Sequence, residues 1–159
     1  MSTTITAEPG TQEILTSRVF DAPRDLVYSV YTDPTTVPDW YGPAYLTTVV
    51  DQMEVKKGGV FRYIQRDPSG GEHCFNGVYH TCRASELLVH TFEYEGAPDS
   101  IGLVTITFED APGGMTKLTE VSLFPSVEVR DAVVNSGMEA GARELMDRLA
   151  ALLAKKQGK

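Results

Sequence analysis

The chain closes with EVRDAVVNSGMEAGARELMDRLAALLAK, residues 128–155, and the way the rest of the chain packs follows from this segment. It contains no proline. Its apolar residues and one glycine recur along one stripe at the spacing of an α-helix: Val134, Met138, Gly141, Leu145, Leu149 and Leu152. The sequence therefore predicts one long C-terminal helix, from about Glu128 to Lys155. Gly137 and Gly141 weaken it by about 1 kcal/mol each relative to alanine, and they let another group approach its backbone.

Strand-like segments fill most of the chain before that helix. The first is Glu13–Asp21, and the chain reads as β-structure from Tyr45 to Phe124. Within that region Val104, Ile106 and Phe108 alternate with polar residues, which is typical of a half-buried strand. Short Gly- and Pro-containing turns between the segments indicate an antiparallel meander. A sheet that has only one long helix to cover it curls around that helix, so we expect α+β architecture with about six or seven strands.

Two short helices are predicted between the first strand and the meander. Pro23 suits the first position of a helix, and apolar residues from Leu26 to Tyr31 follow at helical spacing. Asp33-Pro34 stops this helix, and a second short helix is expected to start there. Pro38 and Gly42-Pro43 then break it.

Composition limits the classes of function. The 159 residues predict a single domain, which we place at residues 12–155, between flexible tails at 1–11 and 156–159. A net charge of −8 argues against nucleic-acid binding and against attachment to an anionic membrane. No apolar run reaches the roughly 20 residues of a membrane span, and the first dozen residues lack the apolar core of a secretory signal. Cytoplasmic localisation is therefore expected.

Neither a disulfide nor a metal site is expected. If Cys74 and Cys82 share one strand, their α-carbons lie about 26 Å apart, too far for a bridge. Two free thiols suit a reducing compartment. His73 and His80 have opposite parity on that strand, and with His90 and the cysteines they do not form a metal-ligand spacing. We predict no metal and no cofactor.

Several short motifs occur in an order that is typical of one family. They are Arg18-Val19-Phe20-Asp21-Ala22-Pro23, Trp40-Tyr41-Gly42-Pro43, Gly58-Gly59, Phe75-Asn76-Gly77-Val78-Tyr79 and Gly137-Met138-Glu139-Ala140-Gly141. With these motifs the sequence resembles the Aha1-like branch (activator of Hsp90 ATPase homologue 1-like) of the START-like, or SRPBCC, superfamily. The resemblance implies a helix-grip fold and an apolar cavity between sheet and helix. Many relatives carry a bulky aromatic where this chain has Ala142, so an inward-facing Ala142 implies a roomier pocket.

Aromatic residues share faces of the predicted strands. Phe61 and Tyr63 lie on one face of their predicted strand, Phe75 and Tyr79 lie on one face of another, and His90 and Phe92 lie on one face of a third. Facing inward, they would line a pocket; a solid aromatic core is the alternative, since parity does not assign the inner face. Trp40 and Tyr41 either contact a ligand or plug one end of the sheet. The predicted ligand-binding residues are Trp40, Tyr41, Phe61, Tyr63, Phe75, Tyr79, His90, Phe92, Met138, Gly141 and Leu145.

The superfamily contains lipid carriers, hormone receptors, polyketide cyclases and co-chaperone domains, so the resemblance implies no single activity. The first hypothesis is non-covalent binding of a small apolar or amphipathic molecule. The second is an interaction module for an Hsp90-type chaperone. The third is a cyclase- or hydrolase-type enzyme that uses His90 or Glu139 as an acid or base. Arg18 and Arg62 are candidates to neutralise a ligand carboxylate. No catalytic residue is assigned, and a homodimer is compatible with the sequence.

Overall fold

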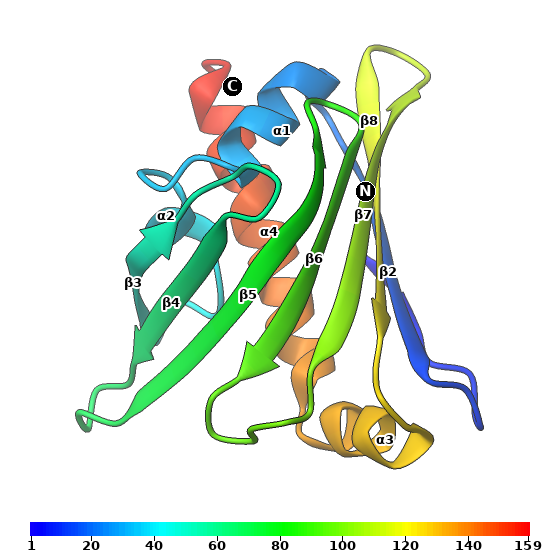
Figure 1. Ribbon diagram of the computed structural model, residues 1–159. Coiled ribbons are helices and arrows are strands. Elements are labelled where there is room, and N and C mark those ends of the chain that lie inside the picture. Colours follow the sequence, from blue (N-terminus) through cyan, green and yellow to red (C-terminus); the bar gives the residue numbers. More distant parts are fainter.

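A curved antiparallel sheet wraps around the C-terminal helix in the computed structural model, which describes residues 1–159 (Figure 1). The eight strands lie in the order β1-β2-β8-β7-β6-β5-β4-β3, and every neighbouring pair is antiparallel. The strands are β1 (Thr4–Thr6), β2 (Glu13–Phe20), β3 (Thr47–Met53), β4 (Val60–Arg66), β5 (Glu72–Arg83), β6 (Leu87–Tyr94), β7 (Gly102–Ala111) and β8 (Met115–Leu123). The helices are α1 (Arg24–Tyr31), α2 (Val37–Trp40), α3 (Val127–Asn135) and α4 (Met138–Lys156). The predicted helix-grip fold is confirmed.

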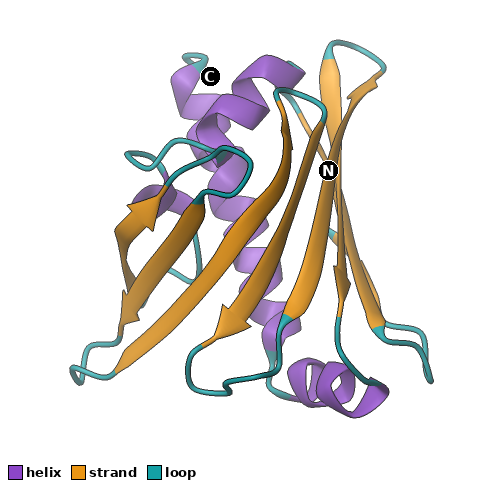
Figure 2. Ribbon diagram, viewed as in Figure 1, coloured by secondary structure: helices purple, strands orange, loops and turns teal.

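The concave face of the sheet carries the core. On β7 the alternating residues Val104, Ile106 and Phe108 are buried, as the period of two predicted. From the other side, α4 contributes Met146, Leu149 and Leu153, so the helix and the inner sheet face share one apolar cluster. Figure 2 shows α4 running along this face, with α1 and α2 beside it and α3 at one end of the sheet.

Register shifts help the sheet to curve around α4. One lies on β3, between Val50 and Gln52, and another on β5, between Tyr79 and Thr81. An extra residue in one strand of an antiparallel pair bends that strand and increases its twist. The β5 irregularity comes directly after Tyr79, whose side chain points inward and is 4% exposed.

The long helix predicted from Glu128 to Lys155 is broken into α3 and α4. Ser126 caps α3, because its hydroxyl accepts a hydrogen bond from the Val129 backbone N–H at 3.1 Å. The chain then turns at Gly137, which has a left-handed backbone with φ of +85°. Val134 consequently leaves the predicted apolar stripe and is exposed. The prediction of one continuous helix was therefore wrong at this position.

Both ends of the chain are tied to the domain. Thr4–Thr6, inside the stretch expected to be a flexible tail, forms β1 and pairs with β2. Thr3 is buried, and both Arg18 and Arg143 donate hydrogen bonds to it. At the other end the Lys159 ammonium lies 3.1 Å from the Asp21 carboxylate. Polar anchors rather than apolar side chains hold these ends, so hydrophobic patterning gave no sign of them.

Cys74 and Cys82 both lie on β5 as free cysteines. No group of three or more His, Cys, Asp or Glu side chains is arranged so that it could hold a metal ion. None of the helices is both long enough and apolar enough to span a membrane.

Candidate functional site

A cavity of about 260 Å³ lies between the concave face of the sheet and the first half of α4. Of its 21 lining residues, 16 are hydrophobic, so the wall is mostly apolar. Strands β2, β4, β5, β6, β7 and β8 supply one side of the wall, and α4 supplies Met138, Ala142, Leu145 and Met146 on the other. The sheet and the helix thus meet here without filling the space between them completely.

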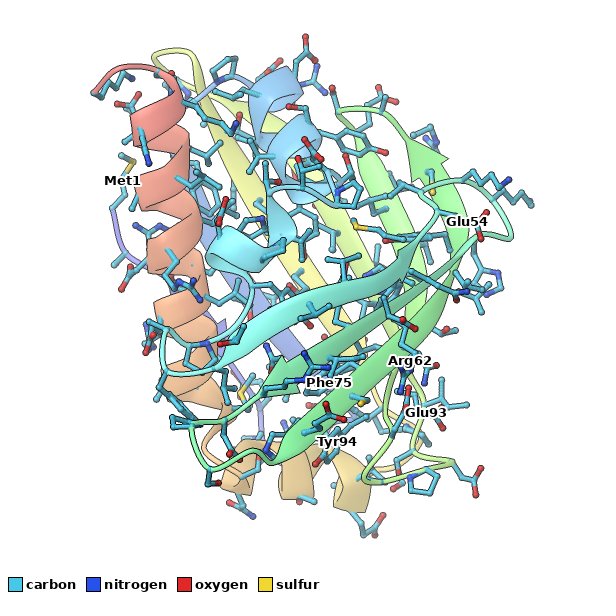
Figure 3. The ribbon with its side chains drawn as sticks, turned by 90° about the vertical axis from the view of Figure 1, so that its left-hand side faces the viewer. Met1, Glu54, Arg62, Phe75, Glu93 and Tyr94 are labelled. Atoms are coloured by element: carbon cyan, nitrogen blue, oxygen red, sulfur yellow. The ribbon has the colours of Figure 1, made fainter.

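Nine of the eleven predicted ligand-binding residues line this cavity: Trp40, Tyr41, Phe61, Tyr63, Tyr79, His90, Phe92, Met138 and Leu145. Phe75 and Gly141 do not. The ring of Phe75 packs instead against Phe92 and Tyr94, with ring centroids 5.4 and 5.2 Å away. Figure 3 shows Phe75 and Tyr94 toward the end of the sheet that is nearer to α3. Ala142 does line the cavity, so the missing aromatic side chain leaves space there.

The aromatic side chains of the wall form a connected cluster. Tyr31 and Trp40 have ring centroids 4.8 Å apart, Trp40 and Tyr41 5.8 Å, and Tyr41 and Tyr63 4.8 Å. Phe61 continues the series, 5.0 Å from Tyr63. Trp40 is 1% exposed, as a plug would be, and it also lines the cavity, so its contact with a ligand stays a prediction.

The segment with Trp40, the last residue of α2, and Tyr41 is hydrogen-bonded to α4. Arg148 donates hydrogen bonds to the backbone carbonyls of Gly42, at 2.6 Å, and Asp39, at 2.9 Å. The hydroxyl of Thr48 on β3 donates to the Tyr41 carbonyl at 2.9 Å. These bonds fix the backbone on both sides of the two aromatic residues, so the wall at this end of the cavity is preorganised.

Glu120 is the functional candidate that sequence reasoning missed. It lies on β8 opposite Thr16 of β2 and Ile106 of β7, on the inner face, and its side chain lines the cavity. Burial raises the pKa of its carboxyl group, and the hydroxyl of Ser122 partly opposes this by favouring the ionised form. A carboxyl group in an apolar wall is the most unusual chemical feature of the cavity.

The β8 sequence explains why Glu120 was missed. Val121 and Leu123 are apolar but point to the outer face, whereas Leu118 and Glu120 share the inner one. Because Glu120 lies two residues after Leu118 on the same strand, the inward-facing Leu118 was the signal that could have placed Glu120 on the inner face. Glu139 was considered as the cavity acid instead, and that hypothesis was wrong: its carboxylate is exposed and lies 2.8 Å from the Arg143 guanidinium.

His90 is the second ionisable group in the wall. Its Nδ1 lies 2.8 Å from the Thr91 carbonyl oxygen, which can only accept, so Nδ1 carries the proton. In the neutral ring Nε2 is then an acceptor. Burial lowers the pKa of His90, which favours this neutral form. Burial disfavours the charged form of tyrosine too, and it therefore raises the pKa of Tyr31, Tyr41, Tyr63 and Tyr79. Their hydroxyls stay protonated and can donate hydrogen bonds.

The two arginines considered as carboxylate partners do not reach the cavity. Arg62 lies on the outer sheet face, where its guanidinium is 2.9 Å from Glu95 and 3.3 Å from Asp51 (Figure 3). Arg18 pairs with the Asp147 carboxylate. Among all 21 lining residues there is no lysine and no arginine. The cavity therefore offers an acid and several hydroxyl groups but no permanent positive charge.

Comparison with known proteins adds a family and a set of folds. The family model described as Activator of Hsp90 ATPase homolog 1-like protein matches residues 21–154. A crystal structure of a Rhodobacter sphaeroides protein is similar, with a TM-score of 0.89 and 25% identity over 98% of this chain and 99% of that one. A Mycobacterium smegmatis protein has a TM-score of 0.86 and 21% identity over 96% and 97% of the two chains. An Arthrobacter aurescens protein has a TM-score of 0.87 and 23% identity over 96% and 91%. No curated protein matched the sequence.

Proposed function

The chain belongs to the Activator of Hsp90 ATPase homolog 1-like family, and from this premise we propose that it binds a small apolar or amphipathic molecule. The observation that carries the proposal is the cavity of about 260 Å³ between the sheet and α4, with its mostly hydrophobic wall. Binding sites for small molecules combine such a wall with a few polar groups that orient the ligand. Here Glu120, His90 and the tyrosine hydroxyls are those groups.

The volume limits the size of the ligand. An engineered apolar cavity of about 150 Å³ holds benzene, whereas sites for drug-sized ligands start near about 300 Å³. The cavity of about 260 Å³ lies between these values. We therefore expect a ligand with one or two rings and a short polar arm, rather than a sterol or a long-chain lipid.

Trp40 supports the proposal through its ring rather than through its polar edge. Its indole Nε1 is buried and has no hydrogen-bond partner in the protein. A buried donor without a partner costs about 1–3 kcal/mol of stability. That nitrogen has almost no accessible surface, so the contact that Trp40 offers to a bound molecule is its aromatic ring, which lines the cavity.

Trp40 also provides the test, since it is the only tryptophan in the chain. Titration of 3-phenylpropan-1-ol, a small amphipathic probe, should change Trp40 fluorescence with saturation. Native mass spectrometry of protein purified from its own host should then show an adduct that denaturation removes. If neither a panel of ring-containing probes nor the host supplies a bound molecule, the proposal fails.

A second proposal follows from the family's name, which refers to activation of the Hsp90 ATPase. Under it the chain binds an Hsp90-type chaperone through its surface. A pull-down with the host's Hsp90 and a measurement of its ATPase rate test this directly. Filling the cavity by substitution should leave such an interaction intact, whereas it should abolish binding of a small ligand.

A further inference from the structure

We infer that the cavity selects ligands that carry a positively charged amine, with the Glu120 carboxylate as the counter-ion and the aromatic wall around the cation. This inference names the ligand class for the proposed binding function and rests on it. Its two supports are the distribution of charge in the wall and the arrangement of the aromatic rings.

The cavity wall around Glu120 carries no permanent positive charge. The titratable groups that face the same cavity are Tyr31 from α1, Tyr41 from the loop after α2, Tyr63 from β4, Tyr79 from β5 and His90 from β6. None of them is a permanent cation. The residues from α3, α4 and β7 that line the cavity are Val133, Met138, Ala142, Leu145, Met146 and Val104, and none of these titrates.

Two arginines on elements that pack around the cavity bind other groups. Arg18 on β2 lies opposite Leu118, next along the inner face from Glu120, but it pairs with Asp147 and bonds Thr3. Arg130 on α3 lies 2.8 Å from Asp131 and also donates to the Glu13 carbonyl. Neither lines the cavity. No lysine or arginine therefore lies in the cavity wall beside Glu120.

A carboxylate in this position favours a cationic partner. An ionised carboxylate in an apolar wall is costly unless an opposite charge or hydrogen-bond donors compensate it. The Ser122 hydroxyl offers one donor. A ligand ammonium offers both a charge and up to three donors, and charge-assisted hydrogen bonds are about twice as strong as neutral ones. Occupation by an amine thus relieves the cost that folding leaves at Glu120.

The aromatic wall adds a second attraction. Tyr31, Trp40 and Tyr41 line the cavity as a connected group, with Trp40 centroids 4.8 Å from Tyr31 and 5.8 Å from Tyr41. The Glu120 charge contributes to the raised pKa of both Tyr31 and Tyr41, so these rings belong to the surroundings of the carboxylate. Aromatic faces attract cations, most strongly when the site excludes water.

A neutral ligand is the competing reading, and it predicts the opposite pH dependence. If Glu120 acted as a protonated acid that donates to a ligand carbonyl, affinity would fall as pH rises through its raised pKa. An amine requires the ionised carboxylate, so its affinity should rise with pH over the same range. Protonation of His90 at low pH would also repel the amine and therefore acts in the same direction.

The test uses three probes of matched shape: 3-phenylpropylamine, 3-phenylpropan-1-ol and 3-phenylpropanoate. Titrations followed by Trp40 fluorescence and calorimetry should rank them amine, alcohol, carboxylate. The amine should bind at least about tenfold more tightly than the alcohol, which is the effect of one charge-assisted hydrogen bond. Over pH 5–8 the amine stays protonated, since alkyl amines titrate near about 10.4.

Matched substitutions assign the effect to Glu120. Glu120→Gln should weaken the amine by about tenfold to a hundredfold and leave the alcohol within about threefold. Glu139→Gln, the same change at the exposed end of α4, should alter neither. Unchanged alcohol binding by Glu120→Gln also shows that the variant is folded.

The outcomes separate the two proposals. Equal binding of amine and alcohol, tighter binding of the carboxylate, or an unchanged amine affinity in Glu120→Gln would overturn the inference while leaving the binding function standing. If none of the three probes binds, the inference fails, and toluene, a smaller neutral probe with one ring, then shows whether the cavity accepts any molecule at all.

Discussion

Burial of the Glu120 carboxyl couples its ionisation to folding. Its pKa in the folded chain is raised above the ordinary value of 4.5, so the folded state holds the proton to higher pH than the unfolded state. Stability is therefore lost as pH rises from about 4.5 through the raised pKa, and the loss is complete above it. We predict that Glu120→Gln raises the free energy of unfolding at pH 8 by about 1 kcal/mol or more.

Urea denaturation at pH 4 and pH 8 checks this prediction. The gain should shrink toward pH 4, where the carboxyl is neutral in both states and resembles the amide. Glu139→Gln is the control, since that side chain is exposed and should give no comparable rise. A Glu120→Gln variant that is less stable than the parent protein at pH 8 would show that the ionised carboxylate is well solvated.

Ala142 decides how much space the α4 side of the cavity leaves. Its methyl group lines the cavity, so the larger ring of Ala142→Phe should project into that volume. We predict that this substitution weakens small probes by about tenfold or more, equivalent to about 1.4 kcal/mol, while stability is kept or raised. Fluorescence titration of 3-phenylpropan-1-ol measures the affinity in a variant that retains Trp40.

The matched control is Ala151→Phe, at an exposed position on the same helix. It should leave probe affinity unchanged. If Ala142→Phe bound the probe as tightly as the parent protein, the ligand would lie outside the cavity.

At the scale of elements, periodicity predicted most strands and the first short helix, because each buries one face. The second short helix was expected to start at Asp33-Pro34 and to break at Pro38, but α2 spans Val37–Trp40 and holds Pro38 in its first turn. Periodicity failed where another force decides the structure. The stripe that includes Met138 and Leu145 extends backward to Val134 by spacing alone, yet the chain turns at Gly137 and exposes Val134. Strand β1 has one apolar residue, Ile5, and is held by its backbone ladder, while two arginines bond the preceding residue, Thr3.

Two glycines near this turn give opposite predictions for the same substitution. Gly137 has φ of +85°, a conformation that costs about 1–2 kcal/mol for a residue with a β-carbon. Gly137→Ala should therefore destabilise the protein by about 1 kcal/mol, after the smaller entropy of the unfolded chain is counted. Gly141 lies inside α4, and the position that a β-carbon would take there is open space. Gly141→Ala should therefore stabilise the protein by about 0.5–1 kcal/mol.

Chemical denaturation of both variants provides the comparison, and each serves as the control for the other. Opposite signs would show that the break between α3 and α4 depends on the left-handed glycine. If Gly137→Ala stabilised the protein as Gly141→Ala does, α3 and α4 would form one helix in solution.

Periodicity also predicted one part of the site and missed another. Strand parity grouped Phe61 with Tyr63 and His90 with Phe92, and all four line the cavity. The same parity also included Phe75, which packs on Phe92 and Tyr94 instead, because a strand can extend past the end of a cavity. Glu120 was not found, since hydropathy places a carboxylate outside by default.

At the scale of the whole molecule, one feature of the sequence was sufficient for the architecture. Only one long apolar stripe was available to cover the expected six or seven strands (the structure has eight), so the sheet had to curve around it. Whether the curved sheet closes fully on α4 depends on the volumes of side chains that meet from opposite walls. That Ala142 of α4 lines the same cavity as Tyr63 and Tyr79 of the sheet is a property of the assembled fold, which no local pattern contains.

A ligand in that interior should stabilise the entire domain, because the cavity walls come from six strands and all four helices and exist only when the chain is folded. With free ligand at a hundred times its Kd, the folded state gains about 2.7 kcal/mol. For a domain of this size that corresponds to a rise in Tm of about 5–10 °C. Thermal unfolding with and without 3-phenylpropan-1-ol measures the shift. At the same probe concentration Ala142→Phe should lose about half of the shift or more, and Ala151→Phe should retain it. An equal shift in both variants would mean that the probe binds to the surface and that the cavity is not the site.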